Sequence, residues 1–165
     1  MQLYPDLIKI QKTVYEPCGL KCTNIIIDQE SKEYGACEFN INQKKVLFRI
    51  AKITPTKNGQ FVTFWKRLVT GVIAPFDWTD NIDFFIVTVK TGVYFGQFVF
   101  PKNVLLERDI ISKNGVGGKR AIRVYPPWDN VDNKQAIKTQ AWQNEYFFSI
   151  HKEHYDKKRI QSLFV

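Results

Sequence analysis

The amino-acid sequence predicts an α/β (α+β) fold, a single-domain sandwich in which helices flank a central mixed β-sheet. Three observations predict it. Apolar residues at helical spacing open the chain, several strand-like runs follow at short intervals, and neither a long linker nor an internal repeat divides the 165 residues. Because this length corresponds to one domain of ordinary size, we expect residues 1–165 to form one unit.

The first element is a helix followed by antiparallel strands. Its apolar stripe has spacings of four, three and four residues and consists of Leu3, Leu7, Ile10 and Val14. Pro17 and Gly19 end the helix. Three strand-like runs follow, at Thr23–Asp28, Tyr34–Ile41 and Val46–Ile53. Short polar linkers separate these runs, so we expect neighbouring antiparallel strands.

The segment after Pro55 fits two kinds of element. Four apolar residues recur at the spacing of a helical face, namely Phe61, Phe64, Trp65 and Leu68. This spacing predicts a helix over Asn58–Val69, although the aromatic and β-branched content also suits a strand. We expect the helix.

The second half of the chain predicts a hairpin and then alternating helices and strands. Thr91-Gly92 is a turn signal between two strands, Phe84–Lys90 and Val93–Phe100. The elements expected after the hairpin are a short helix from Pro101 to Glu107, a glycine-rich lid or connector over 113–120, a strand at Ala121–Tyr125, a helix at Asn133–Gln143, a strand at Tyr146–Ile150 and a helical C-terminus.

The composition indicates a basic, aromatic-rich protein. Lys and Arg number 24 against 16 Asp and Glu, which gives a formal charge of +8, and aromatic residues make up 15%. Such a surface favours acidic partners, nucleic acid before anionic lipid. The chain has neither a signal-peptide pattern at its start nor an apolar run near the ~20 residues of a membrane span, so we expect a cytoplasmic protein that makes no membrane contact.

The cysteines and histidines predict no metal site. Cys18, Cys22 and Cys37 are too few for a disulfide framework. Two of them could join His151 and His154 around zinc, but no second local cluster fixes that geometry. We expect reduced cysteines and no cofactor.

Two basic stretches carry the candidate nucleic-acid contacts. The candidate phosphate-binding side chains are Arg49, Lys52, Lys57, Lys66, Arg67, Lys119, Arg120 and Arg123. Trp65 and Trp128 lie among them in sequence and offer ring faces for unstacked bases. The alternative is that these charges are ordinary solvated residues and that the rings belong to the core. The two stretches form a binding surface only if they meet on one face.

One arrangement suggests catalysis. Metal-dependent nucleases often place an acidic residue on one strand and an acidic-x-Lys triplet on the neighbouring strand, where the carboxylates hold Mg²⁺. Glu38 and Lys52 occupy two of these positions, but Ile50 stands at the triplet's acidic position and cannot bind a metal. A competent site would need another carboxylate, for which Asp83 is the candidate. The structural alternative is that Glu38 pairs with Arg49 across the hairpin.

Several strings of residues, in order along the chain, resemble the MepB family, named after a gene of a bacterial multidrug-efflux operon. They are Tyr34–Phe39, Phe48–Arg67, Gly96–Lys102, Gly118–Ala121, Arg123–Asp129 and Lys134–Trp142. The resemblance implies a restriction-endonuclease-like core. Because the nuclease triplet is broken at Ile50, we carry over nucleic-acid binding and not cleavage.

The sequence therefore predicts a cytosolic nucleic-acid-binding protein on a nuclease-like fold, with DNA preferred to RNA. One alternative is an Mg²⁺-dependent nuclease with a degenerate acidic-x-Lys site, which would require the metal. Another is an accessory ligand- or protein-binding module of an efflux system, for which we would expect a large apolar pocket lined by Phe and Trp. The sequence specifies no oligomeric state.

Overall fold

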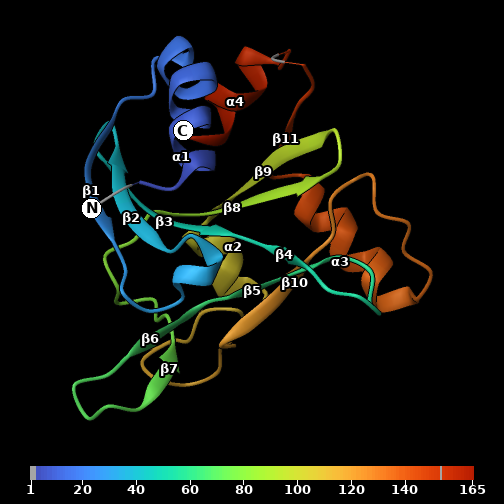
Figure 1. Ribbon diagram of the computed structural model, residues 1–165. Coiled ribbons are helices and arrows are strands. Elements are labelled where there is room, and N and C mark those ends of the chain that lie inside the picture. Colours follow the sequence, from blue (N-terminus) through green and yellow to red (C-terminus); the bar gives the residue numbers. More distant parts are fainter. Residues whose placement is uncertain (1–2, 153) are drawn as a thin grey trace.

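A six-stranded mixed sheet lies at the centre of the computed structural model, which describes residues 3–152 and 154–165 (Figure 1). The strand order is β1-β2-β3-β8-β9-β11. Their bounds are β1 Cys22–Ile27, β2 Cys37–Ile41, β3 Lys44–Ile50, β8 Phe84–Thr91, β9 Tyr94–Pro101 and β11 Phe147–Ile150. β3 and β8 are parallel, and every other neighbouring pair in this sheet is antiparallel. The predicted mixed sheet is confirmed.

Helices cover one face of this sheet. α1 (Pro5–Ile10) continues through a π-helical turn at Gln11–Tyr15, and α4 (Lys157–Leu163) packs beside it (Figure 1). The predicted stripe residues Leu7, Ile10 and Val14 are fully buried against the sheet. The helical segment ends where Gly19 adopts a positive φ of 75°. The first predicted helix is therefore confirmed.

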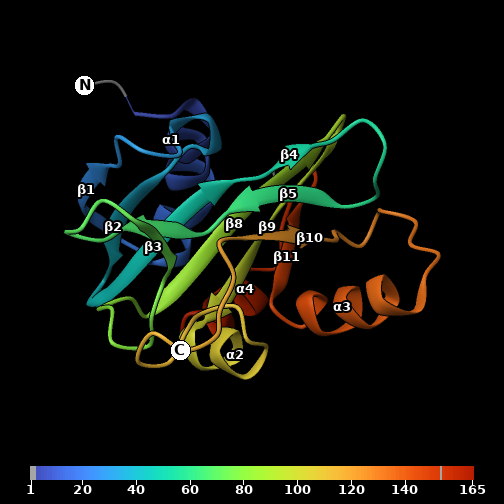
Figure 2. The same cartoon turned by 90° about the horizontal axis from the view of Figure 1, so that it is seen from below.

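A second, smaller sheet and two helices cover the opposite face (Figure 2). The small sheet has the order β10-β5-β4. Its strands are β4 Lys52–Ile53, β5 Gln60–Thr63 and β10 Ala121–Val124, and the helices are α2 Lys102–Glu107 and α3 Lys134–Asn144. Val62, Ile122 and Val124 point inward and join the core formed with the large sheet. Their neighbours along the strands therefore face away from the core.

The expected helix over Asn58–Val69 is wrong. The chain forms β5 there and then β6 (Trp65–Arg67), which pairs with β7 (Ile73–Pro75). Burial alternates along residues 60–64, with Gln60, Val62 and Phe64 buried and the two residues between them half-buried. This period of two is that of a strand. The sequence of this segment fits both a helix and a strand, and pairing with β10 and β4 selects the strand.

Two other expected strands have different limits. Tyr34 belongs to a 3₁₀ turn at Lys32–Tyr34, and β2 begins at Cys37. The run Val46–Ile53 divides at Ala51, because Lys52 and Ile53 leave the large sheet and pair with β5. The hairpin β8–β9, both later helices, β10, β11 and α4 agree with the expected elements to within a few residues.

Candidate nucleic-acid interface

The outer face of the small sheet carries a row of cations and rings. Arg123 on β10 and Lys52 on β4 both lie opposite Phe61 on β5, so the three side chains share one face. The Arg123 guanidinium lies 5.9 Å from the centre of the Phe61 ring. The Lys52 ammonium lies 4.8 Å from the centre of the Tyr34 ring. Each cation is thus placed over an aromatic face.

Arg123 is oriented by the loop between β4 and β5. Its Nη2 donates to Thr54 Oγ1 at 2.8 Å, and its Nη1 donates to the carbonyl of Asn58 at 3.2 Å. Because a guanidinium has five N–H donors, these two bonds fix its plane and leave donors for a ligand. A fixed guanidinium loses less side-chain entropy when it binds a phosphate.

A cleft of about 570 Å³ lies beside this row, between β10 and α3. Four cations line it, namely Lys57, Arg108, Lys119 and Arg123. Among the described residues of its lining there is no carboxylate. The positive charge of the cleft is therefore not neutralised from within, and it favours a polyanion.

Aromatic rings and a helix end complete the cleft. Phe61, Tyr125 and Trp142 line it, and the Arg108 guanidinium lies 5.0 Å from the centre of the Trp142 ring. The first turn of α3 also faces the cleft, where Asn133 Oδ1 accepts the amide of Ala136 at 2.8 Å. The positive end of the α3 dipole adds to the potential of the cations.

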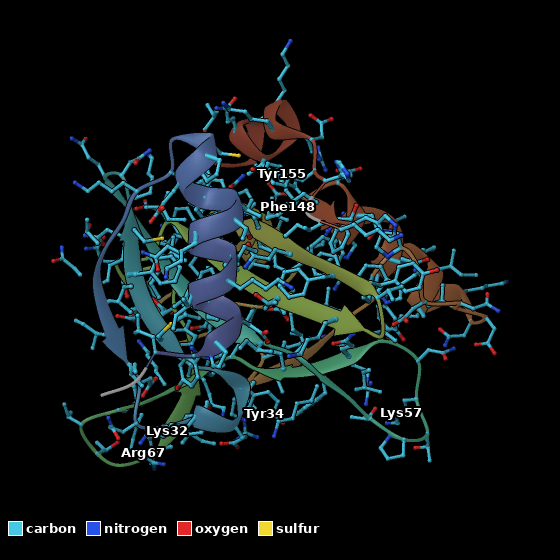
Figure 3. The ribbon with its side chains drawn as sticks, turned by 45° about the horizontal axis from the view of Figure 1, so that its top comes forward. Lys32, Tyr34, Lys57, Arg67, Phe148 and Tyr155 are labelled. Atoms are coloured by element: carbon cyan, nitrogen blue, oxygen red, sulfur yellow. The ribbon has the colours of Figure 1, made fainter. Side chains whose placement is uncertain are left out.

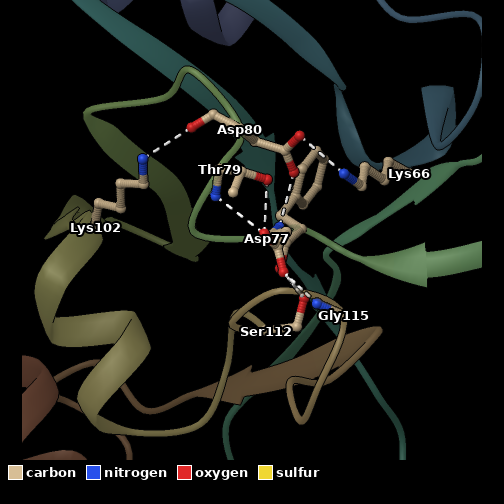
Figure 4. A network of polar contacts seen from close by, with 8 residues as sticks. Lys66, Asp77, Thr79, Asp80, Lys102, Ser112 and Gly115 are labelled. Atoms are coloured by element: carbon tan, nitrogen blue, oxygen red, sulfur yellow. Dashed lines mark hydrogen bonds and ion pairs between the residues drawn. The ribbon is translucent and has the colours of Figure 1, made fainter.

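A buried carboxylate holds the glycine-rich connector in place (Figure 4). Asp77 Oδ1 accepts from Ser112 Oγ at 2.6 Å and from the Gly115 amide at 2.9 Å, and Asp77 Oδ2 accepts from Thr79. The hydrogen bond from Ser112, with those from Gly115 and Thr79, keeps the pKa of Asp77 well below its usual range, although burial opposes this shift. The connector is therefore anchored to the 76–80 segment.

The same connector positions Lys119. The Gly118 amide donates to Asp109 Oδ1 at 2.9 Å, and the Lys119 amide donates to the carbonyl of Ile110 at 2.9 Å. The amides of Gly115 and Gly118 are thus bound to the protein's own carboxylates. The connector serves as a support for the cleft, and its bound amides do not form a phosphate cradle.

Arg49 does not belong to this interface, contrary to the sequence-based expectation. Its side chain is 1% exposed, and it donates to the carbonyls of Thr63 at 3.2 Å and Phe48 at 3.0 Å. Alternation along β3 turns Arg49 toward the interior between the two sheets. A phosphate in solvent cannot reach it.

The predicted residues on β6 lie apart from the cleft. Lys66 and Arg67 form ion pairs with Asp80 at 2.8 Å and Glu30 at 2.6 Å, and the Arg67 guanidinium lies 5.6 Å from the centre of the Trp65 ring. Figure 3 shows Arg67 and Lys57 at well-separated parts of the molecule. The basic stretch 49–67 is therefore divided among the interior, the cleft and β6.

Two predicted residues remain. Arg120 is exposed immediately before β10, next to Lys119, but it does not line the cleft. The Trp128 ring stacks on Tyr94 with centroids 5.2 Å apart and lines a separate cavity. Lys57, Lys119 and Arg123 are thus the predicted residues that meet in one cleft, with Lys52 in the adjoining row.

The catalytic pair Glu38 and Lys52 is not brought together. Glu38 lies opposite Leu47 and pairs with Lys45 at 3.8 Å, so the alternative pair with Arg49 is not formed either. Asp83 lies near the start of β3, where its Oδ2 accepts the Lys45 amide at 2.8 Å. Lys52 is five residues beyond Leu47, or roughly 16 Å along an extended strand. In the described residues, no group of three or more His, Cys, Asp or Glu is placed to hold a metal ion.

Sequence reasoning missed Arg108 and Trp142. Arg108 follows α2, and Trp142 lies on the third turn of α3, 34 residues later. Neither lies in a basic or glycine-rich string. Their cation–π contact depends on how α2 and α3 pack against the same side of the sheet, so no local signal could have paired them.

Comparison with known proteins places the chain in a family. A family model described as MepB-like matches residues 28–149. The chain belongs to the MepB-like family. A crystal structure of MepB is 31% identical, covers 89% of this chain and 97% of its own, and superposes with a TM-score of 0.77. The predicted family is thus confirmed.

Other comparisons add less about this MepB-like protein. A bacterial homing endonuclease is 15% identical over 86% of this chain and 90% of its own chain, with a TM-score of only 0.41. No curated protein sequence matches the chain significantly. Among the described residues, no helix is both long enough and apolar enough to cross a membrane.

Proposed function

We propose that this MepB-like protein binds nucleic acid in the cleft between β10 and α3, in the cytoplasm and without cleaving it. The observation that carries the proposal is the lining of the cleft, where four cations and three aromatic rings occur with no carboxylate among the described residues. Cations neutralise phosphates and release counterions, and ring faces stack with bases. DNA is the expected ligand in preference to RNA.

The arrangement of acidic groups supports binding without cleavage. Glu38 lies opposite Leu47, in the middle of β3, and Asp83 lies near the start of β3. Lys52 lies beyond the other end of β3. Neither Glu38 nor Asp83 lines the cationic cleft in which a phosphodiester would bind. A metal-dependent cleavage step needs a carboxylate-bound metal at the scissile phosphate.

Fluorescence anisotropy with labelled single- and double-stranded DNA and RNA tests the proposal. The affinity should fall steeply between about 50 and 200 mM salt, and it should be greater for DNA. Because no metal bridge forms in this cleft, added Mg²⁺ should not increase the affinity. Gels run after incubation with Mg²⁺ should show intact strands. Absence of binding at low salt, or binding that salt does not weaken, would overturn the proposal. Mg²⁺-dependent nicking that Glu38→Ala abolishes would favour the nuclease alternative.

A further inference from the structure

A second cavity, of about 990 Å³, borders the edge strand β11 and the C-terminal end of α3. All four residues of β11 line it, together with the start of β9, the segment Pro127–Trp128 and residues leading into α4. Figure 3 shows two of its lining residues, Phe148 and Tyr155, beneath α4. The size is that of a small-molecule site.

The wall of this cavity is aromatic and held in place. The Trp128 ring stacks on Tyr94 at an interplanar angle of 16°, and it meets Phe147 edge-on with centroids 5.7 Å apart. Trp128 Nε1 also donates to Thr91 Oγ1 at 3.2 Å. These contacts fix the indole before any ligand binds. A flat ring would therefore bind without the entropic cost of ordering the side chains of the wall.

The charged groups of the wall are used by the protein itself. Arg159 donates to the carbonyls of Phe147, Asn144 and Glu145, and Asp156 accepts the Arg159 amide as the N-cap of α4. These two side chains carry opposite charges. The cavity therefore differs from the cationic cleft and favours an uncharged ligand over a polyanion.

The free edge of β11 supplies a hydrogen-bonding pair. The Tyr146 carbonyl accepts the Val99 amide of β9, and successive residues of a strand point their N–H and C=O groups to opposite sides. Residues 146, 148 and 150 therefore face β9, whereas 147 and 149 face the free edge. Arg159 occupies the Phe147 carbonyl, and Ser149 is exposed. The N–H and C=O of Ser149 thus point outward beside the aromatic wall.

We propose that this cavity binds a planar, uncharged heteroaromatic ligand whose edge carries an adjacent hydrogen-bond donor and acceptor. The ring lies against the aromatic wall, and its edge pairs with the backbone N–H and C=O of Ser149, as another strand would. The site requires neither the cationic cleft nor nucleic acid. Among the described residues, none lines both the cavity and the cleft, so the two sites can be tested separately.

Titration of the full-length protein with 2-quinolinone, followed by backbone amide NMR, tests the site. This probe is planar and uncharged, and its lactam carries N–H and C=O side by side. Shifts should concentrate at the amides of residues 94–95, 128 and 147–150. N-methyl-2-quinolinone, which lacks the donor, should bind about tenfold more weakly or worse. Shifts distributed elsewhere, or equal affinity for the two probes, would overturn the proposal.

Variants at Ser149 separate its backbone from its side chain. Ser149→Pro removes an N–H that points away from the ladder, which an edge strand tolerates, and it should weaken 2-quinolinone binding about tenfold. Ser149→Ala keeps that N–H and should bind the probe within about twofold of the unaltered protein. Equal weakening by both variants would assign the contact to the hydroxyl and overturn the proposal. If Ser149→Pro fails to fold, the pair of probes on the unaltered protein decides.

Discussion

The buried guanidinium of Arg49 and the carboxylate of Asp28 form an ion pair of 4.0 Å across the edge of the core. The Arg49 side chain is 1% exposed, whereas that of Asp28 is 40% exposed. Burial lowers the pKa of Arg49, and Asp28 is the first of the groups that oppose this shift. Since Arg49 also binds the Thr63 carbonyl, it connects β3 with the small sheet that bears the cleft.

Asp28→Asn should lower the free energy of unfolding by about 1–3 kcal/mol, because it leaves a buried guanidinium without its counter-charge while Asp28 itself is partly solvated. Urea unfolding measures the change. Glu33→Gln is the control, since Glu33 is an exposed carboxylate in the same segment, and its effect should stay within about 0.5 kcal/mol. Equal effects of the two changes would mean that the ion pair is not a stabilising contact.

Asp77→Ala should destabilise the protein by about 2–3 kcal/mol, because Ser112, Thr79 and the Gly115 amide lose a charged acceptor. Thermal and urea unfolding measure the loss. Asp132→Ala, at an exposed position on the loop before α3, should have almost no effect. A small loss at Asp77 would show that the connector keeps its place without this carboxylate.

Low pH should lower the stability of the folded protein through protonation of Asp77. Because the pKa of Asp77 is lower in the folded than in the unfolded protein, its contribution is present above the unfolded value of about 3.9 and is lost as the pH falls below about 4. The unaltered protein should therefore lose stability over that range more steeply than Asp77→Asn does. Parallel pH profiles would contradict the assigned role.

Gly118→Ala should cost more stability than Gly115→Ala. Both glycines have a positive φ, of 83° and 81°, so each substitution carries a backbone penalty of about 1–2 kcal/mol. At Gly118 the new Cβ would also lie 2.8 Å from Pro75 Cβ and from the Ser112 amide nitrogen, whereas at Gly115 it would enter open space. We expect a further 1–3 kcal/mol, roughly, at Gly118 in urea unfolding. Equal losses would indicate that the connector shifts freely.

Lys57→Ala combined with Lys119→Ala should flatten the salt dependence of nucleic-acid binding. Each phosphate contact contributes about 0.7–0.9 to the slope of log K against log salt, so two lost contacts should reduce the slope by about 1.4–1.8. Lys12→Ala combined with Lys44→Ala removes the same charge at exposed positions outside the cleft lining and should leave the slope nearly unchanged. Equal slopes for both pairs would place the binding surface elsewhere.

The first helix was predicted correctly because its burial pattern has one period. The stripe of Leu7, Ile10 and Val14 repeats at helical spacing and is buried as a helix. The segment 60–64 carried both periods, and its pairing with β10, some 60 residues later, selected the strand. Local spacing cannot contain that information, because the hydrogen bonds that decide it are made to a distant segment.

Two candidate residues show that the sequence also could not predict which charged side chains reach the site. Arg49 and Lys57 both belong to one basic stretch of the sequence, yet Arg49 is buried beneath the small sheet and Lys57 lines the cleft. The sequence does not show which way a charged side chain points, because that depends on the register of its strand and on the neighbouring strand. Arg108 lies outside that stretch and still reaches the cleft, because α2 ends beside α3.

The sequence by itself determined the excess of positive charge, the mixed α/β class, the first helix, the β8–β9 hairpin and the family. These depend on composition, on residue order or on periodicity within a few turns of chain. Tertiary structure alone decided that Lys57, Lys119 and Arg123 meet, that Glu38 and Lys52 do not, and that the edge of β11 borders an aromatic cavity. The physical reason is that strand pairing and sheet packing join segments far apart in the chain, and the position of a side chain follows from them.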